Sequence, residues 1–585
     1  MDTMSKPQDH WYAQWAPQRV GPSRRLSVLL LVVALVAGAC SGGDTSTDDD
    51  GSAGDGDAGD VGAGDVTNAD TFVHSLGGEP EGLDPAQVSE GGYGDRVIIQ
   101  VYETLVHIPP EGPEPEALLA TEVPSADNGL ISDDGRTYTF PIREGVVFHD
   151  GSDLTAEDVK FSWDRVIEMD MPEGQSGTLT QIVEETRVVD DFTFEVTLQQ
   201  PAGWFLSSVV PSVPASVVSQ EAVEANGGVE PGQPNEFMAT NMVGTGPHQF
   251  VSWDRGERLT FERFEDYWGE PAALHARFEV SVDDAATVLG LRAGDFDLVE
   301  PVPQFIDEVE GDEGIVVEER GFLLEPMHLA FNLNIPEGAL PSEDTIPTDF
   351  FHDKRVRQAF NYAFDYEAYI NVGLGGHGAP ATYLPPDLLG HDPDAPKYSQ
   401  DLELAEELFR ESGWWDEGFS VSVIVESDNP TFGPIALVLK DSLEGLNPNF
   451  RINVLEVAEA QFDEAHAQSP FEYAMWVKNG DPFNDPHALM DHYHHPDGAW
   501  GETLGYRNGY ENPDQIAALI DEAGFEADPE RREELYHELL PLLHDDPMWI
   551  WAADEANIQI YRSWVQDFVY NTLWIMPRWR YYDKG

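Results

Sequence analysis

Apolar residues recur along the chain with two different periods. Strand patterns are predicted at residues 71–76, 136–140, 193–198, 249–253, 258–262, 328–333 and 421–425, and those at 136–140 and 193–198 alternate apolar and polar side chains as half-buried strands do. Spacing of three and four residues predicts helices at residues 96–106, 155–166, 285–294, 353–363, 402–412, 515–523 and 531–544. Strands that alternate with helices predict an α/β fold with mixed layers and partly parallel sheets.

Turn and capping patterns mark several boundaries. Asp150-Gly151 predicts a tight turn between apolar flanks. Thr155 and Asp158 have the spacing of a capping box, so Thr155 is expected to begin a helix. Gly294 is expected to end the helix at residues 285–294, since glycine suits a helix C-terminus.

The composition describes a large folded chain without disulfides. Its 585 residues are 41% hydrophobic and include 15 Trp but a single Cys. This length predicts two to four domain-sized cores. One cysteine excludes an internal disulfide framework, so packing itself must hold the fold together.

The N-terminus carries the parts of an export signal. Arg24 and Arg25 precede an apolar run at residues 26–39. As a helix this run would span about 21 Å, too short to cross a bilayer comfortably. Residues 37–40, Ala-Gly-Ala-Cys, resemble the lipobox of bacterial lipoproteins. The resemblance implies a signal peptide at 1–39 and diacylation of Cys40; an ordinary secretory signal with an incidental cysteine is the alternative.

Residues 40–70 are predicted to be a disordered acidic linker. Residues 41–69 are mainly Gly, Ser, Asp, Ala and Thr, with almost no large apolar side chain. Such a segment buries too little surface to offset the entropy of ordering. We expect it to act as a spacer between the membrane and a folded body.

Acidic residues are spread through the whole chain. The formal net charge is −78. A surface of this kind repels nucleic acid, so no nucleic-acid partner is expected. Adaptation to high salt, where screening reduces self-repulsion, and a generally acidic lineage both account for this composition.

The order of motifs resembles the extracellular solute-binding proteins of peptide, oligopeptide and nickel ABC importers. The resemblance covers about 500 residues, and its most specific block is Ser132–Gly151 followed by Leu154–Ser162. Further matching segments are residues 79–85, 101–106, 244–247, 331–332, 355–360 and 373–380. These motifs are interpreted as scaffold, with Arg355 and Arg357 expected to pair with carboxylates at the surface.

The resemblance implies a type II periplasmic-binding-protein-like fold with two lobes, a hinged cleft and an inserted domain. Lobe I would comprise residues 71–112, 244–330 and 549–585, the inserted domain 113–243, and the other lobe 331–548. Chain crossings near 330 and 548 would serve as hinges for closure over a ligand. The family further implies a monomer without cofactor or resident metal. It would lie outside the cytoplasm, at the outer face of the cytoplasmic membrane, and deliver its solute to an ABC permease in that membrane.

Two segments match places where relatives hold ligand. The first is Glu90, Gly91, Gly92 and Tyr93, whose glycines would leave backbone groups open to an extended peptide. A plain loop is the alternative interpretation.

The second segment covers residues 475–486. In peptide-binding relatives an Asp here receives the ligand's α-amino group, and a desolvated ammonium requires a paired carboxylate. Asp481 is the nearest match, but the Asp-Pro pair begins four positions later, where relatives have three. Asp485 or Asn479 is the alternative anchor.

Aromatic and histidine clusters supply weaker candidates. Trp476, with Trp414, Trp415, Trp500 and Trp574, could line a pocket, although core packing is the more common role of any one of them. Residues 491–495, Asp-His-Tyr-His-His, have metal-ligating side chains, but a solvent-facing loop is the favoured interpretation.

Three functions compete. The first is a receptor that captures a peptide-like solute and delivers it to a permease. The second is a receptor on the same scaffold for a nickel chelate, oligosaccharide or other small solute. The third is a secreted hydrolase, which is disfavoured because the sequence lacks a Gly-x-Ser-x-Gly elbow, a His-Glu-x-x-His helix, a phosphate loop and a cysteine nucleophile.

Overall fold

The computed structural model describes residues 66–585 except 90–91, 172–173, 301–302, 325, 428, 430, 459–460, 463–464, 466–470, 480–483, 527 and 575. Cys40 and the predicted linker up to residue 65 therefore lie outside the described residues. Within the described part of the chain, no helix combines the length and apolar character needed to cross a membrane.

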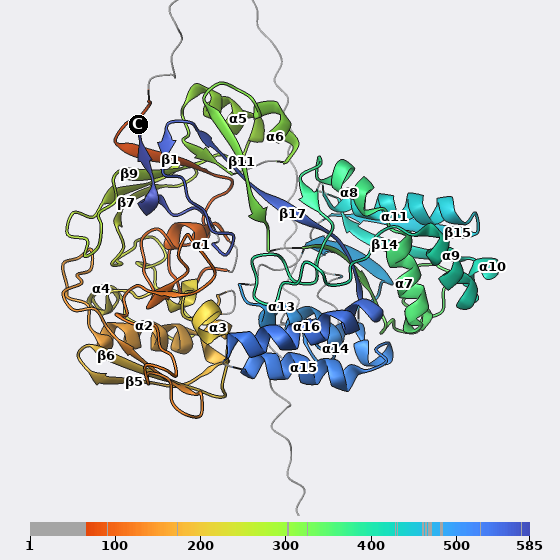
Figure 1. Cartoon of the computed structure of the whole chain (residues 1–585). Helices are drawn as coiled ribbons and strands as arrows, with labels where there is room; N and C mark the ends of the chain where they lie inside the picture. The colour runs from red at the N-terminus through yellow and green to blue at the C-terminus, as the bar shows by residue number, and fades with distance from the viewer. Residues whose placement is uncertain are drawn as a thin grey trace, which may run out of the picture.

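One large sheet runs through both halves of the molecule (Figure 1). Its path is β15 (Phe450–Val457), β14 (Phe419–Glu426), β16 (Met475–Asn479), β12 (Met327–Phe331), β17 (Trp549–Arg562), β10 (Leu298–Val299), β1 (Thr71–Leu76), β9 (His275–Val280), β8 (Arg258–Arg263) and β7 (His248–Asp254). Two further strands, β11 (Ile315–Phe322) and β13 (Gly378–Ala379), also pair with β17. The fold is thus a two-lobed mixed α/β structure.

Strand β17 joins the two lobes. Its residues 549–553 pair with β12, whereas residues 556–562 pair with β11. The connection from β11 to β12 crosses between the lobes beside it. Thirteen of the 14 residues of β17 are buried, including the polar side chains of Asp554, Asn557 and Gln559. This strand is not among those predicted from the sequence.

The second lobe packs helices around β12, β14, β15 and β16. They are α7 (Lys354–Ala363), α8 (Tyr366–Gly373), α9 (Leu402–Glu411), α10 (Trp414–Glu417), α11 (Phe432–Leu446), α13 (Pro486–His494), α14 (Ala499–Leu504), α15 (Pro513–Phe525) and α16 (Pro529–Asp545). The largest buried cluster lies among these elements. Arg357, expected at the surface, is fully buried and ion-paired with Asp546; Arg355 stays partly exposed beside Asp353.

A small sheet packs on the first lobe within residues 113–243. Its order is β4 (Thr137–Pro141), β6 (Thr193–Leu198) and β5 (Val183–Asp190), covered by α2 (Ala156–Met169), with α3 (Gly177–Thr180) and α4 (Gln220–Ala225) alongside. Thr155 caps α2 in a capping box, as predicted. A buried ion pair between Arg165 of α2 and Asp84 ties this segment, hereafter the inserted segment, to the first lobe. Its independence as a domain, and the boundaries predicted for all three domains, stay predictions.

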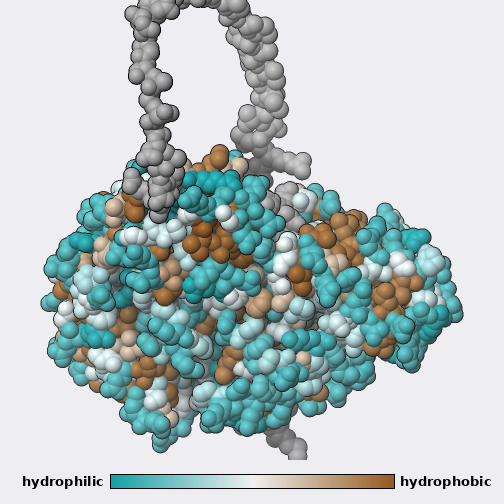
Figure 2. Space-filling view, turned by 45° about the horizontal axis from the view of Figure 1, so that its top comes forward, coloured by the Kyte–Doolittle hydropathy of each residue, from teal (hydrophilic) through white to brown (hydrophobic). Residues whose placement is uncertain are grey.

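The first lobe is completed by α1 (Tyr93–Ile98), α5 (Asp284–Ala293) and α6 (Pro303–Val309). Two short hairpins, β2 (Val106–His107) with β3 (Glu116–Ala117) and β18 (Val565–Gln566) with β19 (Asp583–Lys584), add to it. Gly294 ends α5 with left-handed backbone, as predicted. The face shown in Figure 2 is mainly hydrophilic, with scattered apolar patches.

The helix predicted at residues 96–106 is wrong beyond its first turn. Helix α1 ends at Ile98, and the chain leads through turns into β2. The Val101 carbonyl accepts the Gly246 amide (3.0 Å) instead of a helical partner. Tertiary hydrogen bonding thus outweighs the local helical spacing of Val97, Val101 and Leu105.

Candidate functional site

The carboxyl ends of two groups of parallel strands face each other across the middle of β17. In the first lobe, β9, β1 and β10 are parallel, and β10 runs antiparallel to β17 toward residue 556. In the second lobe, β15, β14 and β16 are parallel. Strand β16 ends with Asn479 opposite Met327, which lies opposite Ala553 of β17. Ligands of open α/β sheets bind outside such carboxyl ends, so we call this region the interlobe gap.

On the first-lobe side, Tyr93 covers the end of β1. A Cβ added to Gly78 would lie 2.2 Å from the Tyr93 ring. Glu300, directly after β10, accepts a hydrogen bond from the Gly77 amide (3.1 Å) and forms an ion pair with Arg96. The Arg96 guanidinium lies over the Tyr93 ring, 4.9 Å from its centroid. These five positions therefore form one interlocked cluster.

Burial, followed by the Glu300 carboxylate, raises the pKa of Tyr93. The phenol therefore stays protonated at neutral pH and can donate a hydrogen bond. Glu81 holds the first turn of α1, because its carboxylate accepts the Gly94 amide at 3.0 Å. A Cβ on Gly92 would lie 2.4 Å from Glu81 Oε1, so this position has no room for a larger residue unless Glu81 moves.

On the second-lobe side, Asp485 is committed to contacts within the protein. Its carboxylate caps α13 by accepting the His487 amide (2.8 Å) and forms a two-pronged ion pair with Arg532 (2.6 and 3.2 Å). The Ser207 hydroxyl of the inserted segment donates a further hydrogen bond at 2.9 Å. Because Asp485 is only 2% exposed, little of it is available to a ligand amine in this conformation.

The remaining predicted contacts divide into three groups. Glu90, Gly91 and Asp481 lie outside the described residues. Asn479 is half-buried at the end of β16, on the opposite side of the gap from Tyr93. Trp476 has no exposed surface and packs on Phe471, with 4.5 Å between ring centroids. Each role in ligand binding stays a prediction.

The histidines at residues 491–495 are not in an exposed loop. Helix α13 extends to His494, which is 1% exposed. Burial lowers the pKa of His494 to about 3, so its ring is neutral. The described residues contain no group of three or more side chains placed to hold a metal ion.

Several residues of the gap were not predicted. Arg96 and Glu300 form an ion pair across 204 positions of sequence, and the Glu81 carboxylate accepts the amide of Gly94, 13 residues away. Single charged residues carry no sequence signal for such pairings. Only the adjacency of β1 and β10 brings them together.

Away from β17, the inserted segment touches the second lobe directly. The Gly203 amide donates to the Gly524 carbonyl (2.9 Å), and the rings of Trp204 and His487 lie 5.9 Å apart. With the bond from Ser207 to Asp485, these interactions form what we call the distal contact. The two lobes therefore meet on either side of the interlobe gap (Figure 1).

Two lobes that share crossing strands, with strand ends converging on a gap between them, define a type II binding-protein architecture. A family model, bacterial extracellular solute-binding proteins, family 5, matches residues 114–501. The chain is 27% identical to the dipeptide-binding protein of Escherichia coli over 86% of this chain and 93% of the relative. It is also 27% identical to heme-binding protein A of Haemophilus influenzae over 83% of this chain and 88% of the relative.

The fold is similar to NikA of Brucella suis, whose crystal structure contains Fe(III)-EDTA. The TM-score is 0.72 at 21% identity, covering 88% of this chain and 100% of that one. The chain belongs to family 5 of the bacterial extracellular solute-binding proteins. The sequence prediction of family and fold class is confirmed.

Proposed function

We propose that this protein is the lipid-anchored substrate-binding protein of an ABC importer. It captures a peptide-like solute in the interlobe gap and delivers it to a membrane permease at the outer face of the cytoplasmic membrane. The observation that carries the proposal is the convergence of β1, β10 and β16 on the middle of β17. The relatives are named as binding proteins, which favours reversible capture over hydrolysis.

The proposed amine anchor is Asp481. Asp485 already receives Arg532, Ser207 and the His487 amide, so a ligand ammonium would have to displace existing partners. Asn479 is the last residue of β16 and supplies a neutral amide. A carboxylate is the better partner for an ammonium leaving water.

Calorimetry on the purified protein tests this assignment. A dipeptide such as Gly-Leu should bind reversibly and be recovered intact, and Asp481→Asn should weaken it by about tenfold or more, as expected from the loss of about 1.5–3 kcal/mol in a charge-assisted hydrogen bond. The matched control is Asp416→Asn, an exposed residue of α10. Unchanged affinity in Asp481→Asn would exclude the anchor, and products of peptide cleavage would favour the hydrolase.

A second candidate ligand class is a metal chelate or other compact solute. The similarity to NikA with Fe(III)-EDTA and to a heme-binding protein favours including it. Titrations with nickel–histidine, heme and an oligosaccharide under the same conditions decide between the classes. Native mass spectrometry of the protein as purified would show a solute that copurifies.

The proposed lipid anchor at Cys40 is tested separately. Cys40→Ser should move the protein from the membrane fraction to the soluble fraction of the cell envelope, with no change in solute affinity. A thioether-linked diacylglycerol on Cys40 should be visible by mass spectrometry of the wild type. Retention of the variant in the membrane would contradict acylation at this residue.

A further inference from the structure

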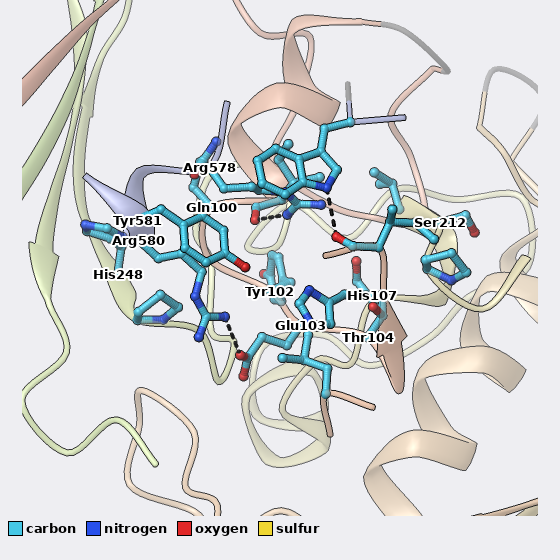
Figure 3. Close-up of a pocket in the computed structure, with 18 residues that line it drawn as sticks. Gln100, Tyr102, Glu103, Thr104, His107, Ser212, His248, Arg578, Arg580 and Tyr581 are labelled. Atoms are coloured by element: carbon cyan, nitrogen blue, oxygen red, sulfur yellow. Dashed lines mark hydrogen bonds and ion pairs between the residues drawn. The ribbon is translucent and has the colours of Figure 1, made fainter. Parts of the chain in front are cut away.

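A separate cavity lies where α1, the inserted segment and the C-terminal residues meet (Figure 3). Its volume is about 50 Å³. The wall includes Glu103 and His107 after α1, Ser212 of the inserted segment, and Arg578, Arg580 and Tyr581 near the C-terminus. Apart from Trp574, none of the residues named above as candidate solute contacts lines it, so it is distinct from the proposed solute site.

The carboxylate in this cavity is already saturated with donors. Glu103 accepts hydrogen bonds from Thr245 (2.9 Å), Tyr267 (2.7 Å) and Trp268 (2.9 Å). Arg580 lies 3.5 Å from it as an ion-pair partner. Burial raises the pKa of Glu103, and Arg580 with the three neutral donors opposes that rise.

Arg578 brings a second positive charge without a carboxylate of its own. Its guanidinium donates to the Ile99 carbonyl, and among the described residues no Asp or Glu lies within ion-pair distance of it. Burial, assisted by Arg580, lowers the pKa of Arg578 to about 10. At neutral pH it is still a cation, half-buried, on which Glu103 acts only from beyond ion-pair distance. A partly desolvated cation without a direct counter-charge is unfavourable.

Burial and then the same two arginines, Arg580 and Arg578, lower the pKa of His107 to about 4. At neutral pH the ring is uncharged, which leaves two arginines and one glutamate as the charged groups on the wall. Glu111 and Glu116 act on Tyr581 from beyond the lining residues, so the excess of positive charge is local.

We propose that this cavity binds a small oxyanion, with Arg578 as its principal partner. Its volume exceeds the roughly 10–15 Å³ that one water requires but is far below the roughly 300–1,000 Å³ of drug-sized ligand pockets. A carboxylate or phosphate group matches the forked donors of a guanidinium. The bound oxyanion would lie between the first lobe, the inserted segment and the C-terminal residues, and its negative charge would stabilise their contact.

Calorimetry with sodium phosphate and with sodium acetate, in one buffer at fixed ionic strength, is the test. We expect saturable binding of one anion per protein, weakened at least tenfold by Arg578→Gln and less by Arg578→Lys. The control is Arg255→Gln, which removes an exposed arginine stacked on Trp253, and should leave binding unchanged. Binding of phosphate alone would indicate inorganic phosphate, whereas binding of acetate too would admit the carboxylate of a solute.

A measurement on the wild type keeps the proposal testable if Arg578 variants do not fold. Anion binding should raise the pKa of His107, followed by NMR of its ring protons, because it offsets the field of the arginines. His352, a partly buried histidine of the second lobe, is the internal control. The proposal is overturned if neither anion binds, or if Arg578→Gln binds as the wild type does. Dipeptide affinity is measured in parallel, so failure here is distinguishable from failure of the solute site.

Discussion

The distal contact should control how firmly the lobes close over a solute. Gly203 is its most sensitive position, because a Cβ there would lie 2.0 Å from the Glu526 carbonyl oxygen and 3.1 Å from its carbon. The Gly203 backbone is not left-handed, so alanine should be compatible with the fold of the inserted segment. We predict that Gly203→Ala holds the lobes apart without unfolding either one.

The expected magnitude follows from the interactions that would be lost. The hydrogen bond from Gly203 to Gly524 contributes about 0.5–1.5 kcal/mol, and the charge-assisted bond from Ser207 to Asp485 about 1.5–3 kcal/mol. Partial loss of both should reduce the closed population and weaken solute binding by about 10- to 100-fold, equivalent to about 1.4–2.8 kcal/mol. Ser207→Ala removes only the second of these bonds, but removes it completely, and should weaken solute binding by about tenfold or more.

Calorimetry with the bound solute, combined with small-angle scattering, checks this prediction. Gly203→Ala should show lower affinity and a larger radius of gyration in the presence of solute. The control is Gly112→Ala, since a Cβ at Gly112 would meet no atom within 4 Å. Wild-type affinity and an unchanged scattering curve in Gly203→Ala would refute the role of the distal contact in closure. A large drop in urea stability would show instead that the substitution damages folding.

Three further predictions concern stability. Burial raises the pKa of Asp554 in β17 to about 7, so the folded state keeps its proton between about pH 4 and 7 while the unfolded state loses it. The free energy of unfolding should therefore fall by up to about 4 kcal/mol as pH rises through this range, and urea titrations should show this fall largely abolished in Asp554→Asn. Arg357→Met should lower the free energy of unfolding by about 3–5 kcal/mol in the same assay, because it leaves the buried Asp546 carboxylate without its ion-pair partner. Adding Asp546→Leu to this variant should recover part of the loss. Wild-type stability of Arg357→Met would contradict this account. The melting temperature should rise from dilute to molar NaCl, by about 1 °C for each kcal/mol of self-repulsion that salt screens in a chain of this size. A flat or falling curve would remove the salt-adaptation hypothesis.

Much of the local structure was predictable because its causes are local. The strands predicted at 71–76 and 193–198 are β1 and β6 with those limits. The helix predicted at 353–363 is α7, which begins one residue later because Asp353 caps it. Caps, turns and periodicity act over a few residues and can therefore be recognised in one sequence.

The gap was predictable only in outline. The sequence indicated residues 90–93 and 475–486, and Tyr93 and Asn479 stand near strand ends that converge on β17. It gave no sign that Asp485 pairs with Arg532 and Ser207, since these partners are 47 and 278 positions away. Whether a carboxylate faces a solute or the protein depends on such distant partners.

Sequence alone determined the family, the α/β class and most elements, because motif order and short-range periodicity survive without tertiary contacts. Only the tertiary structure decided that residues 549–562 form one strand spanning both lobes. This strand is buried on both faces, and its buried polar residues Asp554, Asn557 and Gln559 interrupt the apolar run that marks a core strand. Tertiary contacts likewise gathered Arg578, Arg580 and Glu103 around one cavity, because long-range packing, and not neighbouring sequence, sets which charges share a low-dielectric interior.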